Sequence, residues 1–321
     1  MADPAIGEVA ASVFEKKFGK KPTDNIFLSR ALFYFLGEEG FKEKADGGRL
    51  YEWDIEYAEN TTHQMQGEMD TIDTTRIQVF DAVRFNIKIA AGTVTYSNLE
   101  ELRAAGDSAK FDLIGAKLEN GKNSHIALLN RQAWGLGTGS NDLDGLQKLI
   151  SITPTTGSVG GINRANFSFW RNRQTSGAKT STAYDNLRSS LTSVHNQCSL
   201  GGTENLPTAL LWDRATQEGY EGTLAQLERY NTADRKSGAD AAFLNKAIMF
   251  KGIPAFYDED APSGEARFVN NKFLKFAYHR WMHMDPAVDP ANQLSNVHKV
   301  STFGNLTINA SRFLGVVSAI T

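Results

Sequence analysis

The chain has 321 residues and a formal net charge of −3, and 41% of its residues are hydrophobic and 22% charged. This composition is that of an ordinary globular protein and excludes a disordered or collagen-like chain. The near-neutral charge argues against a protein whose main task is to coat nucleic acid. The single cysteine, Cys198, excludes an intramolecular disulfide and a cysteine-based zinc site. No signal-peptide pattern and no apolar run of about 18 residues is visible, so we expect no membrane partner.

Residues 1–46 are predicted to form an N-terminal arm with one short helical pattern. The alternating stretch "YEWDIEY" follows. Strict alternation over seven residues predicts a strand with two different faces. One face is apolar or aromatic and carries Tyr51, Trp53, Ile55 and Tyr57. The other face is wholly acidic and carries Glu52, Asp54 and Glu56.

A second period-2 stretch, from Ile77 to Ile89, predicts an antiparallel partner for this strand. The pairing places the three carboxylates on the same face as Arg84 and Lys88, which is a favourable cross-strand arrangement. The connecting residues 58–75 are too many for a tight turn, and loops of that size are usually functional. The apolar face of this ribbon needs a cover, which is either its own core or a neighbouring subunit.

Residues 97–134 follow with an approximate helical period of leucines and isoleucines. Ser97 and Glu100 have the spacing of a capping box at its start, and Gly106, Gly115 and Gly121 predict kinks or breaks. The glycine-rich residues 135–145 predict a flexible hinge rather than a nucleotide-binding loop. Beyond the hinge, helical and strand patterns are mixed up to the apolar C-terminal "FLGVVSAI", so the fold class is α+β.

Catalytic and metal-binding patterns are weak throughout the chain. His279 and His283 flank Trp281 and could share one face of a strand, but a third ligand with clear spacing is missing. His195 and Cys198 lie one helical turn apart, where nucleophilic catalysis lacks an orienting partner and an oxyanion site. We therefore predict that the protein is not an enzyme, binds no cofactor or metal, and buries Cys198 in a core.

The stretch "NRANFSFWRNR" interleaves arginines with aromatic residues. Such a stretch could stack on bases and contact phosphates. The same residue types are also enriched at protein–protein interfaces, which is the interpretation that the acidic balance of the chain favours. The inter-subunit contact candidates from this loop are Arg164, Phe169, Trp170 and Arg171.

The order of these parts resembles the tailed-bacteriophage major capsid proteins of the Hong Kong 97 type. The segment "GSVGGINRANFSFWRN" looks like the "GGI-[DN]-R…WRN" segment of one branch of that family. "AYDNLRSSLTSVHNQCSLGG" followed by "PTALLWD" looks like the helix and strand of its axial lobe. "MFKGIPAFYDEDAP" with "ARFVNNKFLKF" resembles further strands of that lobe.

The resemblance implies a Hong Kong 97-type capsid fold with an N-arm, an extended β-hairpin loop, a long spine helix, an axial lobe and peripheral β-strands. It assigns these parts to residues 1–46 (arm), 47–96 (extended loop), 97–134 (spine helix), 137–290 (axial domain) and 291–321 (C-terminal strands of the peripheral domain).

The function that the resemblance implies is that of a structural subunit assembling into hexamers and pentamers of an icosahedral shell. The shell would enclose the double-stranded DNA of a tailed phage, with weak non-specific DNA contacts. The implied partners are further copies of the chain, portal and scaffolding proteins, and in some members decoration proteins. The implied location is the virion capsid, and the host cytoplasm during assembly.

Two alternatives stay open at this point. An encapsulin-like compartment shell shares the fold but encloses a docked enzyme rather than DNA. A metal-dependent hydrolase using His279 and His283 is the more distant alternative. Within the shell hypothesis, we expect the ribbon to rest on an adjacent subunit.

Overall fold

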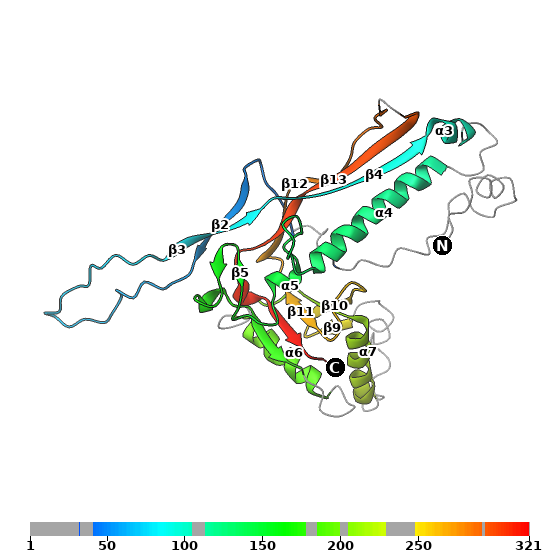
Figure 1. Ribbon diagram of the computed structural model, residues 1–321. Coiled ribbons are helices and arrows are strands. Elements are labelled where there is room, and N and C mark those ends of the chain that lie inside the picture. Colours follow the sequence, from blue (N-terminus) through cyan, green and yellow to red (C-terminus); the bar gives the residue numbers. More distant parts are fainter. Residues whose placement is uncertain are drawn as a thin grey trace.

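The computed structural model describes Leu32 and residues 41–104, 113–177, 185–199, 205–228, 248–290 and 293–320. Most of the predicted arm lies outside these residues, as does Gly106. Within the described residues, no helix is long and apolar enough to cross a membrane. Figure 1 shows an elongated molecule in which a narrow ribbon points away from one end of a long sheet, with a second sheet and its helices beside it.

The long sheet has four strands in the order β1-β12-β13-β4. Its two central strands, β12 (Leu274–Met284) and β13 (Ser295–Ile308), are antiparallel. The edge strands are β4 (Lys88–Ser97), antiparallel to β13, and the short β1 (Lys42–Lys44), parallel to β12. Helix α4 (Leu113–Trp134) runs along this sheet beside β4 and β13 (Figure 1).

The second sheet has six shorter strands in the order β7-β14-β11-β8-β10-β9. Helix α6 (Asp185–Gln197) packs on β7 and β14, and α7 (Arg214–Glu228) contacts α6. The helix expected in "AYDNLRSSLTSVHNQCSLGG" (183–202) and the strand expected in "PTALLWD" (207–213) are confirmed as α6 and β8 (Ala209–Trp212). The six strands are β7 (Arg173–Ser176), β14 (Gly315–Ser318), β11 (Ala266–Val269), β8 (Ala209–Trp212), β10 (Ile253–Tyr257) and β9 (Ile248–Phe250).

Sheet membership does not follow the predicted boundary at residue 290. Strand β12 lies inside the range predicted as the axial domain, yet it pairs in the long sheet. Strand β14 lies inside the range predicted as peripheral, yet it pairs with β7 and β11 of the second sheet. The chain passes between the two sheets more than once, and periodicity within one segment carries no information about such distant pairing.

The predicted long helix consists of α3 (Asn98–Ala104) and α4, with residues 105–112 between them outside the description. The capping box is confirmed, because the Leu99 amide donates to Ser97 Oγ at 3.1 Å and the Ser97 amide donates to Glu100 Oε2 at 3.1 Å. Of the kinks or breaks expected at Gly115 and Gly121, no break occurs, since α4 continues through both. A Cβ on Gly121 would lie 2.1 Å from Val94 Cγ2, so this glycine lets the helix approach β4 closely.

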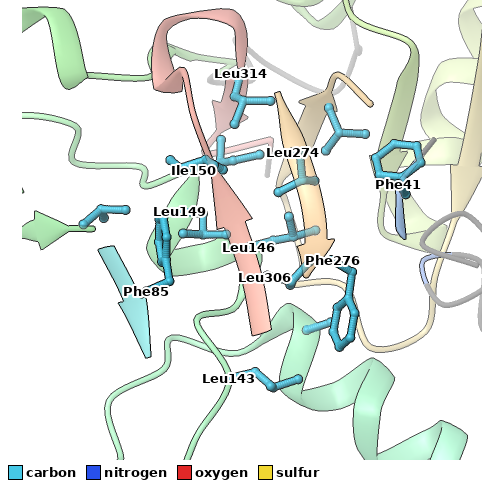
Figure 2. Close-up of a cluster of buried hydrophobic side chains, with 14 of the residues drawn as sticks. Phe41, Phe85, Leu143, Leu146, Leu149, Ile150, Leu274, Phe276, Leu306 and Leu314 are labelled. Carbon is cyan, nitrogen blue, oxygen red and sulfur yellow. The ribbon is translucent and has the colours of Figure 1, made fainter. Parts of the chain in front are cut away.

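The main core lies where the two sheets meet around α5 (Leu146–Leu149), as Figure 2 shows. Leu146, Leu149 and Ile150 are 0% exposed and pack with side chains of the long sheet and of the C-terminal segment. Burying one such side chain contributes about 1.5–3 kcal/mol. Their neighbours in this core include Phe41, Phe85, Leu274, Phe276, Leu306 and Leu314.

Candidate inter-subunit surface

The predicted ribbon is confirmed, because β2 (Leu50–Glu56) pairs antiparallel with β3 (Phe80–Asn86). Their register sets Glu52 opposite Arg84 and Trp53 opposite Val83. The second strand is shorter than predicted, however. It ends at Asn86, and the chain passes directly into β4 of the long sheet.

The apolar face of the ribbon is covered by its own chain. Tyr51 and Ile55 are 5% and 6% exposed, and Val83 and Phe85 on the paired strand are 0% and 2% exposed. The Tyr51 ring lies 5.2 Å from the His279 ring, and burial raises the pKa of Tyr51 to about 12. The expectation that this aromatic face rests on another subunit is therefore wrong for Tyr51 and Ile55, because their surface is already used inside the subunit.

The acidic face of the ribbon is exposed along its length. Arg84 lies on this face, as predicted, and forms an ion pair with Glu52 at 2.9 Å, with both side chains about half exposed or more. Asp54 lies opposite Ala82 and Glu56 opposite Phe80, so the charge pairing does not continue along the strand. The expected place of Lys88 on this face is wrong. Lys88 starts β4, and its Nζ donates to the Ser140 carbonyl.

Residues 57–79 form the tip, which projects from the body beyond the last paired residues of the ribbon (Figure 1). The Tyr57 amide donates to the Val79 carbonyl at 3.0 Å, and beyond this bond the described hydrogen bonds are local turns. Met65, Met69 and Ile72 are 102%, 94% and 68% exposed. Sequence reasoning singled out the ribbon but missed these three side chains, although a methionine pair in a polar loop is a visible signal.

The arginine–aromatic loop is held by internal contacts, beginning with Arg164. This side chain is 1% exposed and donates to the Lys148 carbonyl at 3.1 Å, to the Leu149 carbonyl and to Ser311 Oγ at 3.4 Å. It thereby satisfies carbonyls at the end of α5. Burial lowers the pKa of Arg164 to about 10. The predicted inter-subunit contact of Arg164 is wrong, since no part of its side chain faces outward.

Trp170 is also internal, in η1 (Ser168–Trp170), with 1% exposure and a hydrogen bond from Nε1 to the Val159 carbonyl at 2.9 Å. Its place at an interface is therefore a second correction. Phe169 is half-buried and stacks on Tyr57 at 5.3 Å. Arg171 bridges the Arg164 and Ala165 carbonyls at 2.7 Å each, so its guanidinium closes the loop on itself.

A small hairpin of β5 (Ser158–Val159) and β6 (Ile162–Asn163) carries the loop up to the ribbon. The Arg84 amide donates to the Gly160 carbonyl at 3.0 Å. Gly160 has a φ of +61°, and a Cβ there would lie 3.0 Å from the Val83 Cβ. The "GGINR…WRN" segment thus fixes the base of the ribbon to the body.

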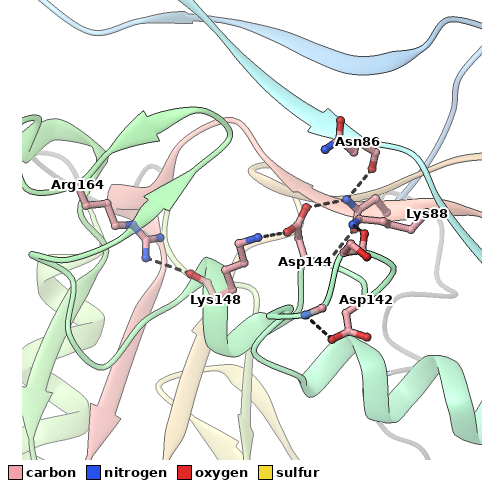
Figure 3. Close-up of polar contacts among 9 residues, drawn as sticks. Asn86, Lys88, Asp142, Asp144, Lys148 and Arg164 are labelled. Carbon is pink, nitrogen blue, oxygen red and sulfur yellow. Dashed lines mark hydrogen bonds and ion pairs between the residues drawn. The ribbon is translucent and has the colours of Figure 1, made fainter.

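A buried polar joint connects the base of the ribbon with the long sheet and with the segment that leads into α5. Asn305 of β13, 0% exposed, donates to Asp144 Oδ2 at 2.7 Å and to the Asn86 carbonyl at 2.8 Å, and accepts from the Asp144 amide at 2.9 Å. Lys148 pairs with Asp144 from the other side (Figure 3). The glycine-rich segment 135–145, predicted as a flexible hinge, is therefore held in place by the hydrogen bonds and the ion pair of Asp144.

The predicted catalytic candidates have separate structural partners. His279 Nδ1 lies 2.9 Å from the Ala45 carbonyl, whereas His283 Nε2 lies 3.3 Å from Asp285 Oδ1. No group of three or more metal-ligating side chains occurs among the residues that the structure describes. Cys198 is fully buried in the core under α6, as predicted, and burial raises its pKa to about 12.

Comparison with known proteins gives matches only at the level of three-dimensional structure. No protein-family model matches the sequence, and no curated protein matches it. The capsid asymmetric unit of cyanophage A-1(L) superposes with a TM-score of 0.71 at 14% identity, over 97% of this chain and 98% of that chain. The capsid of a native GTA particle superposes with a TM-score of 0.60 at 11% identity, over the full length of both chains.

A third similar structure is the holo-SrpI encapsulin complex from Synechococcus elongatus PCC 7942. It superposes with a TM-score of 0.60 at 11% identity, over 97% of this chain and 95% of that chain. The predicted α+β, Hong Kong 97-type fold is confirmed by these whole-chain superpositions. The fold is common to phage capsids and to an encapsulin, so it does not by itself distinguish the two.

Proposed function

We propose that this chain is the major capsid protein of a tailed phage, a structural subunit that assembles into hexamers and pentamers of an icosahedral shell around double-stranded DNA. The observation that carries the proposal is the superposition on the cyanophage A-1(L) capsid, which spans 97% of the chain. The proposal also assigns the protein no catalytic activity.

The ribbon supports the proposal through its shape. A monomeric protein gains nothing from holding three large apolar side chains in solvent on a projecting tip, whereas a shell subunit can place them on a neighbour. The ribbon base is used internally, so the contact with the adjacent subunit falls to the tip, residues 57–79, and to the exposed acidic face. Of the contact candidates, Glu52, Asp54, Glu56 and Arg84 remain available for it.

The same proposal implies how the shell contacts DNA, which proteins it binds and where it is found. The chain carries 34 Lys and Arg against 37 Asp and Glu, which suits a container that contacts DNA weakly and without sequence preference. Portal and scaffolding proteins, and in some phages decoration proteins, complete the set of partners. The protein then works in the virion capsid after assembly in the host cytoplasm.

An encapsulin-like compartment is the second candidate, and the superposition on the SrpI encapsulin favours it. The two candidates differ in what the shell encloses. A phage capsid encloses nuclease-protected double-stranded DNA, whereas a compartment encloses a protein cargo. Genes for a portal or a terminase beside this gene would favour the capsid.

Electron microscopy of the expressed chain tests the assembly. We expect uniform closed shells, and a discrete monomer or dimer under all buffer and concentration conditions would contradict the proposal. Deleting residues 58–75 should leave a folded subunit that assembles poorly.

A finer variant replaces the exposed Met65, Met69 and Ile72 with serine. Its matched control replaces the polar Thr61, Gln64 and Gln66 with serine. The first triple variant should lose shells, and the control should keep them. Equal shell yields from the two would refute the role of the tip.

A further inference from the structure

Among the residues that the structure describes, no strand pairs with the outer edge of β4. β4 pairs with β13 over ten residues without a register shift and is the last strand in its sheet. Edge strands are normally short, charged, bulged or interrupted by proline, because their free backbone groups invite pairing with another chain. From Ile89 to Ser97, β4 has no charge and no proline. The opposite edge, β1, is only three residues long, Lys-Glu-Lys, and therefore has the usual protection.

The hydrogen-bond pattern shows which backbone groups of β4 face outward. Val297 and Lys299 of β13 bond to Val288 and Asp285 on their other side. Their partners on β4, Thr95 and Thr93, therefore form non-hydrogen-bonded pairs with β13. Alternation along the strand directs the N–H and C=O groups of three exposed residues away from the sheet, namely Ala91, Thr93 and Thr95.

These three residues line one side of a groove of about 580 Å³ between β4 and α4. His125 lines the other side, is 4% exposed, and bonds through Nε2 to Thr302 Oγ1 at 2.8 Å. Its Nδ1 is buried without a hydrogen-bond partner among the described residues. An unsatisfied buried nitrogen beside a row of backbone groups that have no partner in the described part of the chain indicates a site built for a polar chain.

We propose that this edge and groove accept an extended strand from a second copy of the chain, namely residues 71–79 of its ribbon tip. The incoming segment adds a fifth strand to the long sheet and bonds to the outward groups of Ala91, Thr93 and Thr95. The inference rests on the proposed shell function and names the acceptor that the ribbon tip requires.

Composition and geometry select this occupant. The segment "TIDTTRIQV" is rich in β-branched residues, yet no residue of it before Val79 pairs with a strand of its own chain. Its small threonines fit a groove whose lining includes Gly92, Ala116 and Gly121. β3 leads directly into β4, so the tip and the groove lie toward opposite ends of one molecule (Figure 1), and only another copy can bring them together.

Thr93→Pro is the sharpest variant, because it removes an outward N–H and leaves the ladder to β13 intact. The preceding residue is glycine, which tolerates a following proline. Thr93→Val is the matched control, since it keeps both the N–H and the β-branch. The full-length variants are compared for binding of a fluorescein-labelled peptide of residues 71–79, for shell yield and for melting temperature.

We expect the Thr93→Val subunit to bind the peptide at least about tenfold more tightly than the Thr93→Pro subunit. Proline removes the hydrogen bond from the residue 93 amide to the peptide, and we expect the adjacent strand–peptide hydrogen bond to be lost with it. The melting temperatures should agree within a few degrees, and only the control should form shells. Equal peptide binding by the two variants, or no binding by the control, would overturn the inference. If the subunits still formed shells while the peptide result overturned the inference, the proposed function would stand.

Hydrogen exchange with residue-level fragmentation identifies the strand inside assembled wild-type shells. The amides of Ala91, Thr93 and Thr95 should exchange about tenfold or more slowly in shells than in free subunits. Alternate amides of residues 71–79 should be slowed with them. Slowed β4 amides with a fast-exchanging tip would mean that another segment occupies the edge, and unchanged β4 amides would mean that none does. Either result overturns the inference.

Discussion

Asn305→Leu tests whether the buried joint holds the ribbon base, the long sheet and the segment before α5 together. Leucine has the branched shape and the number of side-chain heavy atoms of asparagine but loses all three of its hydrogen bonds, to the Asp144 carboxylate, the Asp144 amide and the Asn86 carbonyl. Each lost bond costs about 1 kcal/mol, and a buried group left unpaired costs about 1–3 kcal/mol. The burial of leucine offsets part of this, so we expect a loss of about 3–5 kcal/mol in the free energy of unfolding.

Urea denaturation of the free subunit, followed by tryptophan fluorescence, measures this loss. The matched control is Asn296→Leu on the same strand, where the amide is half-buried and bonds to Asn98 Oδ1 at 3.3 Å and Glu101 Oε2 at 3.0 Å. That variant should lose no more than about 1 kcal/mol. If Asn305→Leu and the control lost the same amount, the joint would not be the connection that the geometry describes.

Three further predictions concern single side chains. Arg164→Lys should lower the free energy of unfolding by about 2–3 kcal/mol, because one ammonium cannot bridge two carbonyls and a hydroxyl in this geometry; thermal unfolding of the variant measures it. Cys198 should resist a thiol reagent at pH 8 until the chain unfolds, because burial raises its pKa to about 12.

Burial lowers the pKa of His125 and of His195 below the usual 6.5, so the unfolded chain binds more protons near that pH. The free energy of unfolding should then fall as the pH drops below about 6.5. His125→Gln should flatten this dependence in urea titrations from pH 5 to 8, and an unchanged slope would contradict the assignment.

Local features of the fold were predictable because neighbouring residues determine them. The alternation around Trp53 specified a ribbon with one apolar and one acidic face, and the spacing of Ser97 and Glu100 specified the start of α3. Both depend on contacts within a few residues or across one hairpin. The Glu52–Arg84 pair was predictable for the same reason, since the two period-2 patterns admit few registers.

The remaining features depend on contacts between distant segments, which no local pattern encodes. Arg164 looked like an interface residue because it lies among aromatics, but carbonyls at the end of α5 bury it. Gly121 looked like a helix breaker, but its missing side chain makes room for Val94. The strand β4 was missed because its small, uncharged residues show weak alternation, and that same lack of charge is what leaves its edge open.

The proposed contact uses two different surfaces of the subunit, and this determines which assemblies the chain can form. The tip and its acceptor are different surfaces of one subunit, so each copy donates at one end and accepts at the other. Such heterologous contacts close into rings only when the rotation between copies is fixed, and otherwise give open chains. That rotation depends on the angle between the ribbon and the long sheet, because β3 carries the tip and β4 carries the acceptor. Asn305 bonds to the Asn86 carbonyl between these two strands. Under the proposed contact, the buried joint would therefore set the geometry of assembly in addition to the stability of the subunit.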